Sequence, residues 1–197
     1  MKHTGYDLMK GAEEEDMKKT AVFLADGFEE IEALTPVDFL RRAGIEVTTY
    51  SISGSRSVMG SHDIEVKADC LLSEADHEDT DLFLLPGGKG TELLENCEKL
   101  LTLLKEADSR GKYIAAICAA PRVLGKLGFL KGQRATCFPG NEKFLEGAET
   151  DLKEKAVISG RYVTARGMGA AVEFSAAVTE VLLGKEKAEE ILGKIQF

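Results

Sequence analysis

The feature that most constrains the fold is an alternation of short apolar runs with longer runs of helical spacing. Residues 20–26, TAVFLAD, form a short apolar run that predicts a buried strand, and residues 28–44 then place apolar side chains three or four positions apart. The same order returns along the chain, which indicates βαβ units and a mostly parallel sheet with helices on both faces. We therefore expect an α/β fold of three layers.

The remaining elements follow from the same alternation. Strands are predicted at 20–26, 46–52, 81–88, 113–117, 134–138, 156–160 and 162–166, a hairpin arm or edge strand at 57–66, and helices at 28–44, 91–111, 119–130, 169–184 and 185–195. Pro36, inside the first helix, predicts a kink or a division into two helical pieces.

The alternating pattern also sets the domain organisation. A chain of 197 residues suits one domain, or one domain with an appendage. We expect a single domain at 19–197. Residues 1–18 lack periodicity and hold an acidic cluster at 13–16, so we expect a flexible N-terminal extension there.

The charge and the cysteine pattern exclude several classes. A formal net charge of −9 disfavours nucleic acids and anionic membranes as partners, because both are bound through clustered lysine and arginine. No signal peptide and no apolar run of membrane-spanning length is found. No C-x-x-C pair occurs among the cysteines, and the histidines do not cluster with them, which disfavours a structural zinc site. We expect a cytoplasmic protein with reduced thiols and no metal.

Cys118 lies where a predicted strand meets a predicted helix, in the run YIAAICAAPRVLG. A residue at such a joint occupies a nucleophile elbow, which turns the side chain out of the sheet. The helix N-terminus offers unpaired N–H groups and partial positive charge, so we expect a lowered thiol pKa. The alternative is packing, since free cysteine is often buried, and that interpretation fits Cys70, Cys97 and Cys137.

A glycine pair ends the preceding strand, in the run LPGG. Gly87 and Gly88 let backbone N–H groups approach a ligand closely. The N–H of Gly88 and that of Ala119 can together form an oxyanion hole. The alternative is an ordinary turn between a strand and a helix.

Three acidic residues, Glu29, Glu30 and Glu32, stand at the start of the first helix. Carboxylates favour a helix N-terminus, so we expect at least two of the three to be solvated. Ile31 and Leu34 mark the expected buried side, with Glu32 at its border. A carboxyl near a thiolate has a raised pKa, and when protonated it can donate to the sulfur and act as a general acid/base.

At these residues the chain resembles the ThiJ/PfpI superfamily, and within it the branch of the parkinsonism-associated protein deglycase and its bacterial relatives. The matching stretches, between about 19 and 192, are DGFEEIEALTPVDFLRRAG, LLPGG, IAAICAAPRVLGKLGFLKG, TARGMG and FSAAVTEVLLGKE. The resemblance implies a flavodoxin-like sandwich and a homodimer. It also implies Cys118 as nucleophile, Glu32 as its carboxyl partner, and backbone donors at Gly88 and Ala119.

The sequence departs from related branches at identifiable positions. Ala119 stands where the protease branch has a histidine, and we find no His-x-Glu pair of the amidotransferase kind. Phe138 stands where many family members have a histidine, so Cys118 must be activated by Glu32 and the helix N-terminus alone. His62 is expected to be a surface imidazole, although the hairpin can bring it near the pocket. The residues expected to line the pocket are Gly87, Phe138 and Arg166.

The resemblance implies a cysteine enzyme that converts small 2-oxoaldehydes to 2-hydroxy acids without glutathione, metal or nucleotide. The substrate class is a small reactive carbonyl compound. If the same pocket also acts on early carbonyl adducts of proteins or nucleotides, the activity is that of a deglycase. One alternative is a non-catalytic redox sensor or chaperone that uses oxidation of Cys118. A lesser alternative is a role linked to thiamine or thiazole phosphate metabolism.

Overall fold

The central sheet has seven strands among residues 17–74 and 77–197, which the computed structural model describes. Its order is β10-β11-β7-β6-β1-β2-β5, and all neighbours are parallel except β10 and β11. These strands are β1 (Lys19–Leu24), β2 (Glu46–Ser51), β5 (Cys70–Leu71), β6 (Leu82–Leu85), β7 (Tyr113–Ile117), β10 (Ala156–Ser159) and β11 (Tyr162–Ala165). The predicted extension at 1–18 lies outside the described residues except for its last two.

Helices and two small strand pairs complete the described chain. The helices are α1 (Glu30–Arg42), α2 (Thr91–Glu95), α3 (Glu98–Ser109), α4 (Pro121–Lys126), α5 (Ala171–Leu183) and α6 (Lys185–Lys194), with short 3-10 turns η1 (Leu72–Glu74), η2 (Glu142–Phe144) and η3 (Met168–Ala170). An antiparallel pair joins β3 (Ser57–Met59) to β4 (Glu65–Lys67), and a parallel pair joins β8 (Arg134–Ala135) to β9 (Glu149–Thr150).

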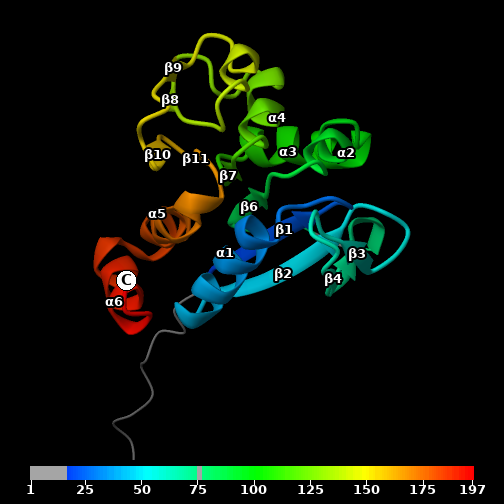
Figure 1. Ribbon diagram of the computed structural model, residues 1–197, viewed down its shortest axis with the longest axis horizontal. Coiled ribbons are helices and arrows are strands. Elements are labelled where there is room, and N and C mark those ends of the chain that lie inside the picture. Colours follow the sequence, from blue (N-terminus) through cyan, green and yellow to red (C-terminus); the bar gives the residue numbers. More distant parts are fainter. Residues whose placement is uncertain (1–16, 75–76) are drawn as a thin grey trace, which may run out of the picture.

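The sheet separates two apolar cores, because alternate side chains of each strand point to opposite faces. Helices α1 and α5 lie on one side of the central strands, and α3 and α4 lie on the other (Figure 1). The first core contains Val22, Leu84, Leu40, Phe174 and Val178, and the second contains Phe23, Phe83, Ile114, Leu104 and Leu124. The three-layer α/β fold with a mostly parallel sheet is thus confirmed.

The strand order identifies where a ligand would bind. When the parallel strands other than the short β5 are numbered along the chain, β1, β2, β6, β7 and β11 become strands 1 to 5. Across the sheet they then stand in the flavodoxin-like order 2-1-3-4-5, so the direction of winding reverses between β1 and β6. In open α/β sheets, ligands bind outside the carboxyl ends of the strands at this switch point. The segments that follow β1, β6 and β7 therefore meet at the expected place.

Several predicted boundaries differ from the structure. The predicted helix at 91–111 is two helices, α2 and α3, and the predicted strand at 134–138 shortens to β8. Pro36 does not divide α1, which is one helix of 13 residues. Tertiary packing maintains it, because Pro36 and the following Val37 are both buried. Within the described residues, no helix combines the length and apolar character needed to cross a bilayer.

Candidate functional site

The site lies at the switch point, where backbone hydrogen bonds join the segments after β1 and β6. Phe28 forms an antiparallel bridge with Gly88. The N–H of Glu29 donates to the Gly87 carbonyl at 3.0 Å, and the N–H of Gly90 donates to the Gly27 carbonyl at 2.9 Å. The start of α1 is therefore fixed against the glycine turn.

Cys118 follows β7 directly and has a left-handed backbone, with φ of 65°. This conformation is uncommon for any residue with a Cβ, and tertiary contacts must maintain it. The Cys118 N–H donates to the Ala165 carbonyl at 2.8 Å, and the Cys118 carbonyl accepts from the Phe138 N–H at 2.8 Å. The predicted elbow is present, and two separate segments hold it.

Two backbone donors face the sulfur. The N–H groups of Gly88 and Ala119 both hydrogen-bond Cys118. Gly88 has a φ of 89°, and a Cβ there would lie 2.5 Å from the Gly27 carbonyl oxygen, so only glycine fits. The two N–H groups predicted to form an oxyanion hole therefore converge on the thiol.

Glu32 reaches the same point from α1 and is fully buried. Its Oε2 accepts a hydrogen bond from the Gly87 N–H at 3.0 Å, and the Cys118 thiol is also hydrogen-bonded to its carboxyl. Its Oε1 has no hydrogen-bond partner in the described part of the chain. One carboxyl oxygen is thus buried with its hydrogen-bonding capacity unused among the described residues.

The acid and the thiol form a coupled pair. Burial raises the pKa of Glu32 to about 7, and the charge of Glu29 adds to this rise, while hydrogen bonds from Cys118 and Gly87 oppose it. Burial and the charge of Glu32 raise the pKa of Cys118 to about 12, against the lowering effect of the Ala119 and Gly88 N–H groups. Between these values the pair holds one proton.

The expected lowering of the thiol pKa was therefore wrong. The Cys118 residue is only 7% exposed, and it stands beside a carboxyl group. Both features disfavour a free thiolate more strongly than the backbone N–H groups favour it. A thiolate can instead form when its proton moves to Glu32.

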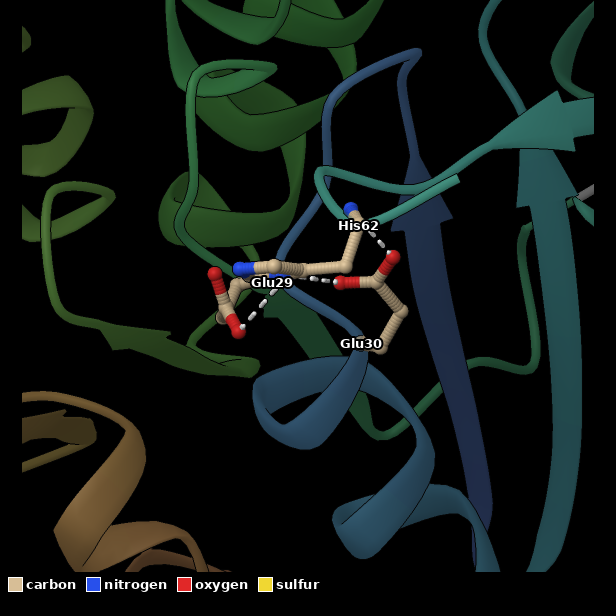
Figure 2. Close-up of side chains that lie close together, drawn as sticks. All are labelled: Glu29, Glu30 and His62. Atoms are coloured by element: carbon tan, nitrogen blue, oxygen red, sulfur yellow. Dashed lines mark hydrogen bonds and ion pairs between the residues drawn. The ribbon is translucent and has the colours of Figure 1, made fainter. Parts of the chain in front are cut away.

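The interpretation of the first helix was also wrong. Ile31 and Leu34 are 50% and 36% exposed, whereas Glu29, Glu30 and Glu32 are all buried. Helix α1 thus turns its acidic face toward the switch point. His62 has an exposed side chain, as expected, but its ring lies 2.9 Å from Glu30 Oε2, and both acids flank it in Figure 2.

Of the remaining predicted pocket residues, Phe138 lies near Glu32, whereas Arg166 makes its contact elsewhere. A Cβ on Gly167 would lie 3.3 Å from the Phe138 ring and 4.0 Å from Glu32 Oε1, so Phe138 and Glu32 flank the same glycine. The Arg166 guanidinium instead donates to the Lys153 carbonyl at 3.3 Å. Gly167 lies in the run TARGMG, whose loop was expected from the sequence to border the pocket without a role for any one residue.

A model of the DJ-1/PfpI family matches residues 18–181. The chain is 41% identical over 180 residues to Protein DJ-1 homolog B of Arabidopsis thaliana, which is 90% of this chain and 41% of that protein. It therefore spans less than half the length of this plant relative. It is 34% identical over 178 residues to Glutathione-independent glyoxalase DJR-1.2 of Caenorhabditis elegans, covering 89% of this chain and 95% of the relative.

The fold is also similar to solved structures. Oxidized Toxoplasma gondii DJ-1 superposes with a TM-score of 0.87 at 36% identity, covering 91% of this chain and 98% of that one. Drosophila melanogaster DJ-1beta gives the same TM-score, identity and coverage. These likenesses agree with the resemblance found in the sequence and with its flavodoxin-like class.

Proposed function

The chain belongs to the DJ-1/PfpI family, and we propose that it is a cysteine enzyme that converts small 2-oxoaldehydes to 2-hydroxy acids without glutathione. The observation that carries this proposal is the pair formed by Cys118 and the buried Glu32 beneath two backbone donors. A glutathione-independent glyoxalase among the relatives supports the substrate class.

The first step makes the nucleophile. Glu32, whose pKa of about 7 suits a general base at neutral pH, takes the thiol proton as the sulfur attacks the aldehyde carbon. Glu32 then gives this proton to the former aldehyde oxygen, so the product is a neutral hemithioacetal and Glu32 is again a carboxylate. The N–H groups of Gly88 and Ala119 stabilise the charge that develops on the aldehyde oxygen.

The second step moves a proton between neighbouring carbons. Glu32 removes a proton from the former aldehyde carbon while the neighbouring ketone oxygen gains a proton, which gives an enediol. A proton then returns to the adjacent carbon as the first hydroxyl loses its own, and the hemithioacetal has become a thioester. Water then hydrolyses the thioester and releases the 2-hydroxy acid and the Cys118 thiol. The net reaction adds one water and needs no oxidant or reductant.

The narrow access to the thiol bears on the substrate. With Cys118 only 7% exposed, small free aldehydes such as methylglyoxal fit the site better than aldehyde adducts of proteins. We therefore place glyoxalase chemistry before deglycase chemistry. No contact in the described site supports a role in thiazole phosphate metabolism.

Redox sensing at Cys118 is the second candidate function. The N–H groups of Gly88 and Ala119, together with a protonated Glu32, would stabilise the sulfinate that peroxide forms on the thiol. A solved relative is an oxidized DJ-1. Peroxide oxidation of Cys118 in a protein without carbonyl turnover would favour this candidate.

The decisive experiment measures methylglyoxal consumption without glutathione and in the presence of a chelator. We expect Cys118→Ala to reduce the rate to background and Glu32→Gln to lower kcat by roughly 10²–10⁴-fold, the usual contribution of general acid–base catalysis. Cys137→Ala, which removes another buried thiol, is the matched control and should retain activity. Turnover by Cys118→Ala equal to that of the wild type would refute the proposal.

A further inference from the structure

Three side chains with metal-binding atoms meet beside the site, outside the proposed mechanism. Glu29 and Glu30 come from the start of α1, and His62 comes from the turn between β3 and β4. Their ligand atoms all lie within 4.8 Å of one another. Figure 2 shows the imidazole between the two carboxylates.

One of these carboxylates is buried without a hydrogen bond. The Glu29 side chain is 9% exposed, and it forms an ion pair with the His62 ring, whose Nδ1 lies 3.6 Å from Oε1. Within the described residues, the Glu29 carboxylate accepts no hydrogen bond. A buried carboxylate left in this state costs free energy unless a charge compensates it. Beside its ion pair with the His62 ring, the Glu29 carboxylate therefore has capacity to bind a cation.

The backbone holds the ligands in place. The His62 N–H donates to Glu30 Oε1 at 2.7 Å, and the preceding Ser61 N–H donates to the Phe28 carbonyl at 2.8 Å. A Cβ on Gly60 would lie 2.2 Å from Glu30 Oε1, so a glycine is needed to make room for this carboxylate. The turn that carries His62 is thus fixed to the segment that carries both acids.

The spacing suits a small tetrahedral ion. Zinc bonds of about 2.0–2.1 Å at tetrahedral angles place neighbouring ligand atoms roughly 3.3 Å apart. The distances from His62 Nδ1 to Glu30 Oε2 and Glu29 Oε1, 2.9 Å and 3.6 Å, lie on either side of this value. The His62 side chain is 67% exposed, so its ring is free to adjust.

We propose that Glu29, Glu30 and His62 bind a divalent transition-metal ion of the zinc class. One imidazole and two carboxylates form a ligand set that zinc uses, and the imidazole favours zinc over magnesium or calcium. Three protein ligands leave the fourth position to water. None of the three ligands takes part in the proposed Cys118 chemistry beyond the effect of the Glu29 charge on Glu32, so the metal site stands whether or not the protein is a glyoxalase.

The test titrates chelator-treated full-length protein with zinc chloride by calorimetry, and with cobalt chloride by visible absorption. Every protein carries Cys118→Ser, because this thiol is a competing metal ligand. We expect one ion per chain and a tetrahedral cobalt spectrum. His62→Ala and Glu29→Gln should each weaken zinc binding by at least tenfold.

Asp63→Asn is the matched control, because Asp63 is an exposed acid beside His62 that lies outside the cluster, and asparagine tolerates its φ of 61°. It should leave zinc binding unchanged. Circular dichroism confirms that each variant is folded. Absence of zinc binding, or equal affinity in His62→Ala, would overturn the proposal and leave an ion pair between His62 and the two acids.

Discussion

Gly87 occupies the gap between the acid and the thiol. A Cβ at this position would lie 2.5 Å from Glu32 Oε2 and 2.7 Å from the Cys118 Cβ. Its N–H also supplies the hydrogen bond that orients the Glu32 carboxylate. The absence of a side chain at one residue thus permits the contact on which the proposed chemistry depends.

Gly87→Ala should therefore separate the pair. We expect a loss of about 1–3 kcal/mol in the free energy of unfolding, the usual cost of overpacking, together with loss of methylglyoxal turnover. Urea denaturation and the glyoxalase assay measure the two effects. Gly54→Ala is the control, because a Cβ at Gly54 meets no atom within 4 Å. Equal stability and activity in both variants would contradict the tight contact.

The buried carboxyl of Glu32 gives a second prediction, on stability. Its folded pKa, about 7, lies above its unfolded value near 4.5, so the protonated form stabilises the fold at low pH. This contribution is complete below the unfolded pKa and is lost as the pH rises through about 7. A shift of this size corresponds to about 3 kcal/mol.

Glu32→Gln does not titrate at this position, so its stability relative to the wild type should increase by up to about 3 kcal/mol between pH 4 and pH 8. Urea denaturation in the presence of a chelator, repeated across this range, measures the difference. The matched control is Glu92→Gln, an exposed change in α2, whose difference from the wild type should stay constant. A constant difference for Glu32→Gln as well would show that burial does not raise the pKa of Glu32.

At the scale of elements, α1 shows how far periodicity can be trusted. The helix itself was predictable from its apolar spacing and its closing Gly44. Its inward face was not, because the pattern assumes that apolar residues point inward, whereas Glu32 is buried and Ile31 is exposed. The buried Glu32 carboxyl accepts a hydrogen bond from Gly87, a partner far away in sequence that the pattern cannot reveal. By contrast, Cys118 was identifiable because it follows β7 directly, and Gly88 because it belongs to the glycine pair shortly after β6.

The exposure of Ile31 on α1 is testable with two truncations. Ile31→Ala should change the free energy of unfolding by less than about 0.5 kcal/mol, because half of this residue is exposed. Leu40→Ala, on the same helix but fully buried, should cost about 2–5 kcal/mol. Urea denaturation at low protein concentration compares them. A large cost for Ile31→Ala would mean that something covers this residue, and the expected homodimer would be the first candidate.

At the scale of the whole molecule, the topology sets where the chemistry takes place. The reversal of strand order between β1 and β6 opens the crevice, and β7 adds the thiol beside it. The alternation of strands and helices was enough to predict the sheet and this edge. The strand order was not predictable from the alternation alone, because it depends on which strands pair across long stretches of chain.

The two backbone hydrogen bonds of Cys118 also have a consequence for biosynthesis. They come from Phe138 and Ala165, which the ribosome adds well after the cysteine itself. A growing chain that ends before Ala165 lacks the end of β11 and one of the two hydrogen bonds that hold the left-handed turn. In the nascent protein Cys118 is therefore not yet paired with Glu32 in the folded site, and the proposed carbonyl chemistry would begin only when translation is nearly complete.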